Sequence, residues 1–396
     1  MKISKKNEGT KNRHMRRSAL KICLLFSAFV LSGCAAKNET VNNEGRLSAP
    51  AISTGTVGIE ADGEYGNVLI GLGADEFNAL GFHYGDSVDV IFSNGYTLSD
   101  IPYFTGYYTM AGDPLLLNFG GDLVAAINYG SLWIEAELSD ADTVEITLHQ
   151  AGKYLDIENA LNIEYTDERS DYASDEVFAN FRSIETHGLK KDTLFRSASP
   201  CDNKHNRAPY TDALMENAGV KLVIDLADSD EEIEGFISSD DFDSPCFASL
   251  YAADAVVPVN LQVDYTSDDY KKNLADALRK IAENDGPYLI HCLEGKDRTG
   301  FVCILLEALT GADYDEMAED YMMSYDNYYG INPQSDPEKY NTILSNNYVP
   351  MITFLCGADN NTDPSSLDFK AGAENYLLSG GMTSEEIDAL RDALQR

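Results

Sequence analysis

Residues 291–300 read HCLEGKDRTG, and this stretch decides the fold of the second half of the chain. An apolar run, GPYLIHC (286–292), leads into it, and a second apolar run, TGFVCILLEALTG (299–311), follows it. The first run has the length of a buried strand and the second has the length of a helix. The stretch therefore predicts a strand, a tight loop and a helix, with the pattern HC-x5-R-T across the loop.

A loop of this kind is expected to bind an anion. The strand ends at Cys292, and the next helix opens with unsatisfied N–H groups that point into the loop. The helix dipole and the fixed charge of Arg298 favour a thiolate at Cys292, and a thiolate is a competent nucleophile. Arg298 presents a planar fork that can hold two phosphoryl oxygens at once. The residues expected to surround the phosphate are Leu293, Glu294, Gly295, Lys296, Asp297 and Arg298.

Three residues beside the nucleophile have expected supporting roles. Lys296 adds a second positive charge to a pocket that must attract an anion. The hydroxyl of Thr299 can donate a hydrogen bond to the sulfur as it leaves a phosphocysteine intermediate. His291 is expected to orient the loop through a backbone hydrogen bond rather than to transfer protons. The set as a whole predicts catalysis, with Cys292 as nucleophile and Arg298 as phosphate clamp.

This loop resembles the signature of the protein tyrosine phosphatase superfamily, and its GKDRT form resembles the bacterial tyrosine and lipid phosphatase branch. The resemblance spans residues 177–396. Other landmarks of that branch appear in the same order, as ANFRS (179–183), LFRSA (194–198), VIDL (223–226) and EDYMMS (319–324). The chain departs from the branch at two places. It has NFRSIETHG where the branch usually has NFRD followed by glycines, and it has DLA (225–227) where the branch has DLR. The missing arginine leaves open how the sheet edge beside the loop is braced.

The resemblance also implies a general acid for the leaving oxygen. In this branch the aspartate inside the loop is thought to serve, which implies Asp297. A more distant plan in the superfamily uses an aspartate upstream of the cysteine, and Asp264 is the best placed for that role. Asp254 is a weaker candidate. We favour Asp297 and keep Asp264 as the alternative.

Residues 177–396 alternate between predicted strands and helices. The runs KLVIDLA (221–227) and AVVPVNL (255–261) read as buried strands, and residues 266–284 read as a helix capped by Thr266 or Ser267. The Tyr-rich stretch DYMMSYDNYYG (320–330) is expected to be helix core. This alternation predicts an α/β domain with a mainly parallel central sheet flanked by helices.

Residues 50–163 have a different rhythm of short alternating runs broken by Gly, Asn and Asp, which predicts a small all-β, barrel-like domain. The runs are NVLIGLG, SVDVIFSNGYTL, LVAAINYGSLWIEAEL and TVEITLH. The region resembles the C-terminal β-barrel of S-adenosylmethionine hydrolases and halogenases. That family's catalytic domain is absent, so the resemblance implies a fold and no activity. Residues 164–176, EYTDERSDYASDE, read as a charged linker.

The N-terminus reads as an export signal. A basic stretch precedes a short apolar run, which is the layout of a secretory signal peptide. Leu31-Ser32-Gly33-Cys34 resembles the lipobox of bacterial lipoproteins, which implies cleavage after residue 33 and lipidation of Cys34. An uncleaved anchor is the alternative. Residues 34–49 are polar and read as a flexible tether.

Composition sets further bounds. The chain has 396 residues and a formal charge of −37, and cleavage after residue 33 would leave 21 Lys and Arg against 65 Asp and Glu, or −44. Nucleic acid is therefore not an expected partner. The five cysteines after residue 34 contain no CxxC pair, so the spacing predicts no zinc site, and it leaves open whether Cys201, Cys246 and Cys356 are paired.

The sequence predicts a protein tyrosine phosphatase-like phosphoric monoester hydrolase that uses a phosphocysteine intermediate and no metal or other cofactor. Its default substrate is a phosphotyrosine protein, and a phosphoinositide or an inositol phosphate is the alternative. An inert surface binding lipoprotein is a contrasting hypothesis, which the intact Cys292, Arg298 and Thr299 disfavour. The expected location is extracytoplasmic, with the chain anchored to a membrane through Cys34 at the cell surface or the periplasmic face.

Overall fold

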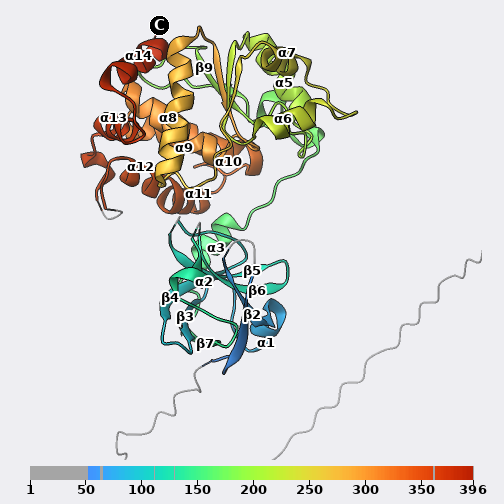
Figure 1. Ribbon diagram of the computed structural model, residues 1–396, viewed down its shortest axis with the longest axis vertical. Coiled ribbons are helices and arrows are strands. Elements are labelled where there is room, and N and C mark those ends of the chain that lie inside the picture. The colour runs from blue at the N-terminus through green and yellow to red at the C-terminus, as the bar shows by residue number, and fades with distance from the viewer. Residues whose placement is uncertain (1–51, 63–65, 111, 129, 360–361, 396) are drawn as a thin grey trace, which may run out of the picture. The chain divides into compact units, whose positions relative to one another are not determined.

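The computed structural model describes residues 52–395, except 63–65, 111, 129, 360 and 361 (Figure 1). The predicted signal peptide, the lipidation site Cys34 and the tether lie outside the described residues. The described residues all belong to one compact unit. Among the described helices, none combines the length and the apolar character that a bilayer span requires. The five cysteines at 201, 246, 292, 303 and 356 are all free thiols.

The first part of the described chain is a closed seven-stranded barrel, as the alternating runs predict. Its strands follow one another around the barrel in the order β1-β2-β6-β5-β4-β3-β7. Neighbouring strands are antiparallel except β4 and β5, which are parallel. The strands are β1 (Val57–Ala61), β2 (Val68–Gly73), β3 (Ser87–Phe92), β4 (Thr97–Phe104), β5 (Pro114–Phe119), β6 (Asp122–Ile127) and β7 (Thr143–Gln150).

One of the alternating runs from which the barrel was predicted is a strand only in part. In the stretch LVAAINYGSLWIEAEL, the first part pairs, in β6. Its second part forms the short helix α2 (Leu132–Glu135), because the hydroxyl of Ser131 caps the helix by accepting from the Ile134 N–H at 3.4 Å. Two further helices belong to this region, α1 (Ala74–Ala79) and α3 (Leu155–Leu161).

The second part is helix-rich and surrounds a five-stranded sheet of order β11-β10-β12-β9-β8. The four strands from β11 to β9 are parallel, and β8 pairs antiparallel with β9 at the edge. Parallel strands end at a common edge, so the segments that follow β9, β10, β11 and β12 meet there. The strands are β8 (Arg182–Ser183), β9 (Leu194–Ser197), β10 (Leu222–Asp225), β11 (Val256–Pro258) and β12 (Tyr288–His291).

Helices cover both faces of this sheet (Figure 1). Successive strand residues point to opposite faces: Ile224 packs into the core beneath α8 and α9, whereas Val223 packs into the core beneath α5 and α7. The helices are α4 (Asp175–Phe178), α5 (Ala208–Ala218), α6 (Asp230–Ile237), α7 (Pro245–Ala252), α8 (Asp268–Glu283), α9 (Asp297–Thr310), α10 (Tyr314–Tyr329), α11 (Pro337–Ile343), α12 (Val349–Leu355), α13 (Phe369–Ser379) and α14 (Ser384–Gln395).

Helix α8 is close to its predicted bounds. The hydroxyl of Ser267 accepts from the Tyr270 N–H and fixes the start of the helix, and Asp268 and Asp269 fill the first turn, where carboxylates suit the helix dipole. Helix α9 is different in kind, because it is buried from Thr299 to Thr310. The chain thus builds its core around the helix that follows the HC-x5-R-T loop.

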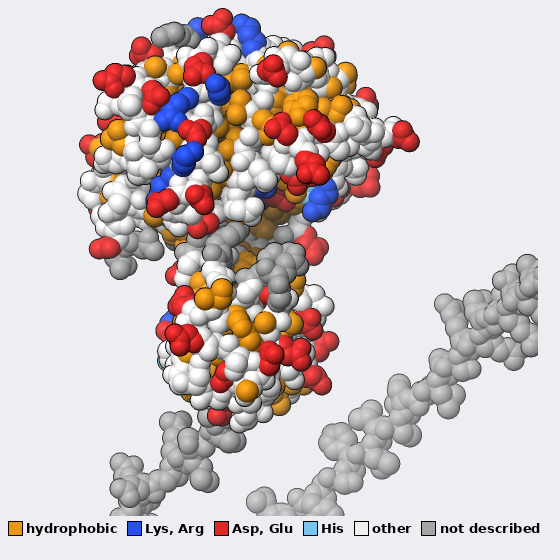
Figure 2. Space-filling model, viewed as in Figure 1, with side chains coloured by type: hydrophobic (Ala, Val, Ile, Leu, Met, Phe, Trp, Pro, Cys, Tyr) orange, Lys and Arg blue, Asp and Glu red, His pale blue; other side chains and the backbone are white. Residues whose placement is uncertain are grey.

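The surface carries the acidic excess of the sequence. Figure 2 shows Asp and Glu side chains spread over the visible face, with fewer Lys and Arg between them. A site for an anion on this chain would therefore need a local group of positive charges.

Candidate active site

The HC-x5-R-T stretch forms a loop between β12 and α9. Strand β12 ends at His291, Cys292 follows with 3% of its surface exposed, and α9 starts at Asp297. Gly295 has φ of +66°, and a Cβ atom there would lie 2.1 Å from the carbonyl oxygen of Ser197. Only glycine fits this turn, because a side chain would meet both backbone strain and a direct clash.

The carbonyl groups of this loop are held outward by donors from other elements. The Ser199 N–H donates to the Leu293 carbonyl at 3.1 Å, and the Tyr328 hydroxyl donates to the Glu294 carbonyl at 2.6 Å. The Asn180 amide donates to the carbonyls of Glu294 and Gly295, at 3.2 and 3.1 Å.

The same loop receives a guanidinium group. Arg196 Nη2 donates to the Gly295 carbonyl at 2.9 Å and to the Lys296 carbonyl at 3.4 Å. Four consecutive carbonyls are therefore engaged on the outside of the loop. The N–H groups of the loop and of the first turn of α9 are left to face the inside, which is the arrangement of an anion site.

Arg298 lies at the entrance of α9 beside this loop. Its Nη1 donates to the Leu261 carbonyl at 3.0 Å, so the segment after β11 helps to hold the guanidinium group in place. The hydroxyl of Thr299 is buried and has no hydrogen-bond partner in the described part of the chain. It is thus available to a group that occupies the loop.

Lys296 is held close to the loop as well. Its Nζ lies 2.7 Å from Asp297 Oδ1 and 5.4 Å from the centre of the Tyr325 ring. Burial opposes the charge of Lys296, but Asp297 and the neighbouring phenols outweigh it and keep its pKa well above the ordinary value. The lysine therefore stays cationic beside the anion site.

The candidate acids occupy different places. Asp297 is the first residue of α9, and its side chain is about half exposed. Asp264 follows the segment that contacts Arg298, and its Oδ1 accepts from the N–H of Thr266 at 3.0 Å. Asp254 lies before the start of β11, whereas Cys292 lies after the end of β12. Because these strands are parallel, the two residues lie at opposite ends of the sheet. Asp297 therefore stands at the junction of the loop and α9, Asp264 follows three residues after Leu261, whose carbonyl holds Arg298, and Asp254 is remote from the loop.

Two tyrosines at this site do not stand out in the sequence. The hydroxyl of Tyr270 is buried without a hydrogen-bond partner among the described residues, and burial and the charge of Cys292 raise its pKa. Tyr328 contacts the loop directly through the bond to Glu294. Their spacing within amphipathic helices signals only core packing, so no sequence pattern distinguishes them from other buried tyrosines.

A buried charge cluster braces the loop from behind. Asp320 on α10 accepts from Arg182 Nε at 2.7 Å, and it also accepts from Arg196. Burial alone would raise the pKa of Asp320, but the charges of Arg182 and Arg196 outweigh it and lower that pKa below its ordinary value. This cluster links β8, β9 and α10, so it braces the loop on the side of β12 that faces β9.

A further carboxyl group lies near this cluster. Glu307 on α9 is fully buried, and burial together with the charge of Asp320 raises its pKa well above the ordinary value. Its protonated form is therefore favoured. Of the two carboxyls, Asp320 is ionised because it pairs with both guanidinium groups.

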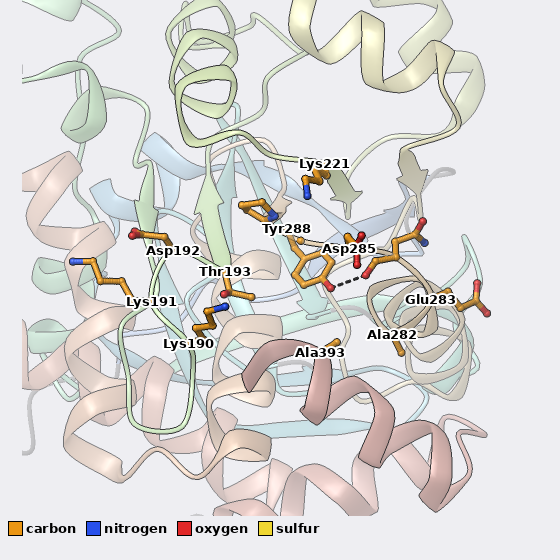
Figure 3. Close-up of a pocket in the computed structure, with 13 residues that line it drawn as sticks. Lys190, Lys191, Asp192, Thr193, Lys221, Ala282, Glu283, Asp285, Tyr288 and Ala393 are labelled. Carbon is orange, nitrogen blue, oxygen red and sulfur yellow. Dashed lines mark hydrogen bonds between the residues drawn. The ribbon is translucent and has the colours of Figure 1, made fainter. Parts of the chain in front are cut away.

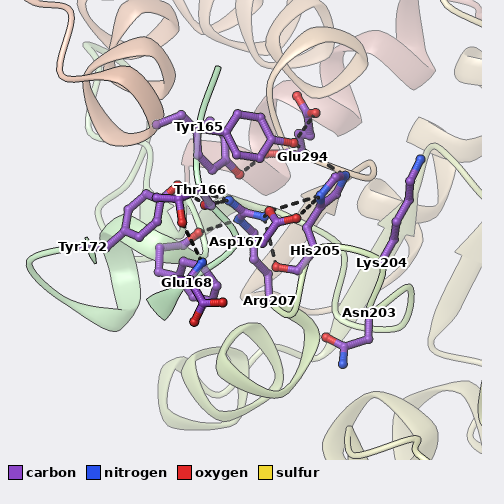
Figure 4. A network of polar contacts seen from close by, with 12 residues as sticks. Tyr165, Thr166, Asp167, Glu168, Tyr172, Asn203, Lys204, His205, Arg207 and Glu294 are labelled. Atoms are coloured by element: carbon purple, nitrogen blue, oxygen red, sulfur yellow. Dashed lines mark hydrogen bonds and ion pairs between the residues drawn. The ribbon is translucent and has the colours of Figure 1, made fainter. Parts of the chain in front are cut away.

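The segment of residues 164–176 contacts the same loop through Tyr165, and it contacts His205 and Arg207 through Asp167 (Figure 4). The hydroxyl of Tyr165 donates to Glu294 Oε1 at 2.6 Å. Asp167 lies between His205 and Arg207, with Oδ1 2.8 Å from Arg207 Nη1. This segment was interpreted as a linker, and in the structure it also forms one rim of the candidate site.

His291 was expected to orient the loop through a backbone hydrogen bond, and a contact with the backbone of Cys292 favours the protonated form of its ring. The ring is fully buried. Burial lowers the pKa of His291 to about 4, so the imidazole is neutral. Its Nε2 lies 3.6 Å from Asp225 Oδ2.

Two cavities differ in their relation to the loop. A cavity of about 320 Å³ is lined by Lys296 and Asp297 together with Tyr325 and Tyr329, among other residues. Another, of about 400 Å³, lies at the starts of the parallel strands and includes Lys190, Lys191 and Lys221 (Figure 3). The second cavity is at the far edge of the sheet from Cys292 and is not part of this site.

Comparison with known proteins gives one match. Residues 176–396, more than half of the chain, match the family model described as "Tyrosine phosphatase family". This range contains the loop, the sheet and every residue described above as contacting the loop, except Tyr165. A search of curated proteins finds no match.

Proposed function

This chain belongs to the tyrosine phosphatase family, and we propose that it hydrolyses phosphoric monoesters through a phosphocysteine intermediate at Cys292. The observation that carries the proposal is the loop itself. Four of its carbonyls are engaged from outside, a buried cysteine begins it and Arg298 ends it. The N–H groups that remain favour a phosphate dianion beside the sulfur.

In the first step, the sulfur of Cys292 attacks phosphorus while the bond from phosphorus to the substrate oxygen breaks. The leaving oxygen takes a proton from Asp297, with Asp264 as the alternative acid. Arg298 contacts two of the three equatorial oxygens and so stabilises the charge of the transition state.

In the second step, water attacks phosphorus and gives a proton to the same carboxylate, and the sulfur leaves as a thiolate. The unpaired hydroxyl of Thr299 donates a hydrogen bond to that sulfur. The products are inorganic phosphate and the alcohol, and the enzyme returns to its starting state. No step in this scheme needs a cofactor.

The proposed default substrate is a phosphotyrosine protein. The tyrosines that line the cavity beside Lys296 and Asp297 support an aromatic leaving group, because aromatic rings pack favourably against one another. The alternatives are a phosphoinositide and a soluble inositol phosphate, which the extra charge of Lys296 would favour. An inert binding lipoprotein remains the contrasting hypothesis.

We place this activity outside the cytoplasm, on a chain anchored through a lipid on Cys34. The support is the lipobox-like LSGC at residues 31–34 after an apolar run. In cells, Cys34→Ser should move the protein out of the membrane fraction. Retention of the variant in membranes would overturn the lipid anchor.

The test of function is phosphate release by the full-length protein from a phosphotyrosine peptide, a phosphoinositide and an inositol phosphate. Cys292→Ser should abolish release from the preferred substrate, and Arg298→Lys should lower kcat about 10²–10³-fold, because lysine keeps the charge and loses the fork. Thermal melts establish that the variants fold. A folded wild-type protein that releases phosphate from none of these substrates would favour the inert binding lipoprotein.

A further inference from the structure

The barrel region contributes to the cavity beside the loop. This cavity of about 320 Å³ is lined by Lys296 and Asp297, which belong to the part of the chain that matches the phosphatase family. It is also lined by residues 107–110, which lie between β4 and β5 and outside that match. We call residues 107–110 the barrel wall. The space next to the proposed general acid is therefore bounded by both regions of the described chain.

Two hydrogen bonds hold the backbone of the barrel wall. Asn346, between α11 and α12, donates through Nδ2 to the Tyr108 carbonyl at 3.3 Å. Asn128, which follows β6, donates through Nδ2 to the Thr109 carbonyl at 2.5 Å. The side chain of Met110 packs against the hydrophobic core that includes α9 and α10. The barrel wall is thus fixed from both regions, and a wall fixed in advance loses little freedom when a ligand binds.

Helix α3 fastens the barrel region to the helices at a second place. It follows β7 along the chain and packs against α11. Ala160 on α3 is buried in the same core as Ile343 on α11, and Leu161 and Ile163 line the cavity. The barrel wall and α3 together attach the barrel region beside the loop, so the cavity is part of the fold.

The lining of the cavity is aromatic and apolar rather than cationic. Its tyrosines are Tyr107 and Tyr108 from the barrel wall and Tyr265, Tyr325 and Tyr329 from the second region. Among the lining residues that the structure describes, Lys296 is the single cation, and it already pairs with Asp297. Such a surface favours an aromatic or apolar group. It offers no free counter-charge to a second phosphate, whose burial would be costly without one.

We propose that the barrel wall is the specificity-determining part of the active site, which binds the organic part of the substrate while the loop holds the phosphoryl group. The inference rests on the proposed function and deepens it. It assigns the substrate to phosphoric monoesters whose organic part is aromatic or apolar and extends beyond the loop, as phosphotyrosine within a peptide does. An inositol that carries several phosphates does not fit this lining.

The test is a binding measurement on the full-length protein that carries Cys292→Ser, by calorimetry, with a phosphotyrosine peptide and with inorganic phosphate. Tyr107→Ala and Met110→Ala, each added to Cys292→Ser, should weaken binding of the peptide about tenfold, because each removes apolar contact area. Binding of inorganic phosphate should not change, because phosphate fills the loop alone. Tyr107 is 40% exposed, so its replacement does not disturb a core.

Ile134→Ala is the matched control in the same Cys292→Ser protein. Ile134 is an apolar residue on α2 of the barrel region, it is 75% exposed, and it does not line the cavity. Its replacement should leave the affinities for both ligands unchanged. Thermal melts establish that all the variants fold.

The outcomes separate this inference from the proposed function. If phosphate binds and neither barrel-wall variant weakens the peptide, the inference is wrong and the proposed function stands. Tighter binding of the peptide by the variants would show that the barrel wall obstructs the site, and it would also overturn the inference. A folded Cys292→Ser protein that binds neither ligand would contradict the anion site itself, and with it both proposals.

Turnover of the peptide gives a second readout in the chain that retains Cys292. Contacts with a part of the substrate that does not react act equally before and during the reaction. Tyr107→Ala and Met110→Ala should therefore raise KM for the peptide about tenfold and change kcat little. A fall in kcat with KM unchanged would show that the barrel wall does not act through binding, and it would overturn the inference.

Discussion

The position of Asp297 bears on its proposed role as general acid. Its carboxylate pairs with Lys296, and its side chain lines the cavity beside the loop. If it donates the proton to the leaving oxygen, its removal matters most for substrates whose leaving group is a poor one. Asp297→Asn should therefore lower kcat about 10²–10³-fold for phenyl phosphate and much less for nitrophenyl phosphate. The measurement is kcat for both esters.

Asp264→Asn is the matched control for that prediction, because it removes the other candidate carboxyl at the edge of the site. We expect its effect to be similar for the two esters. If Asp264→Asn instead slows phenyl phosphate selectively and Asp297→Asn does not, the acid is Asp264.

Glu307 provides a prediction about pH and stability. Its pKa is raised in the folded state, so folding retains a proton that the unfolded chain releases above about pH 4.3. Its contribution to stability is complete below that pH and is lost as the pH rises toward the folded-state pKa. Glu307→Gln is always neutral, and its melting temperature relative to the wild type should therefore increase from pH 5 to pH 8.

The exposed Glu319 on α10 supplies the control for this experiment. The difference in melting temperature between Glu319→Gln and the wild type should change little with pH. A constant difference for Glu307→Gln across the same range would contradict a raised pKa at that residue.

The residues that can be predicted from the sequence are those that carry chemistry within one short stretch. Cys292, Arg298 and Thr299 stand at fixed spacing, and the structure places all three at the junction of β12 and α9. Asn180 and Tyr328 hold the same loop, but they are 114 and 34 residues away from Glu294, the residue whose carbonyl they contact. Contacts of this kind depend on the tertiary fold, and a single sequence does not specify them.

At the scale of elements, the loop depends on α10. Asp320 joins this helix to the buried guanidinium groups of Arg182 and Arg196. Asp320→Asn would leave two buried cations without a counter-charge, and it should lower the free energy of unfolding by about 3–5 kcal/mol. Urea unfolding of the wild type and the variant measures this difference.

Glu319→Gln again serves as the comparison, because residue 319 is exposed on the same helix. Its effect should stay within about 0.5 kcal/mol. An equally small loss for Asp320→Asn would show that the cluster does not brace the loop.

The observed element boundaries agree with the predicted ones where a local capping bond fixes them. They differ from the prediction where pairing with distant strands determines the structure. Ser267 capped α8 as predicted, since its capping bond is local. The second half of LVAAINYGSLWIEAEL has the apolar content of a strand, but Ser131 starts a helix there and no partner strand is available to it within the barrel order. Apolar content alone does not distinguish the two outcomes.

At the scale of the whole molecule, the formal charge of −37 opposes the approach of a phosphate dianion. Added salt screens this field, with a Debye length of about 10 Å at 0.1 M. KM for a small aryl phosphate should therefore fall between low and moderate ionic strength while kcat changes little. A KM that rises steadily with salt would instead show that the local charges of Lys296 and Arg298 dominate the approach.

The central claim is that Cys292 carries the phosphoryl group during turnover. The most direct measurement is to mix the full-length protein with nitrophenyl phosphate, quench within milliseconds and map the modified residue by mass spectrometry. We predict a phosphoryl group on Cys292 at early times, and none at any time in Cys292→Ser. Turnover without a phosphorylated cysteine, or with the phosphoryl group on another residue, would contradict the account.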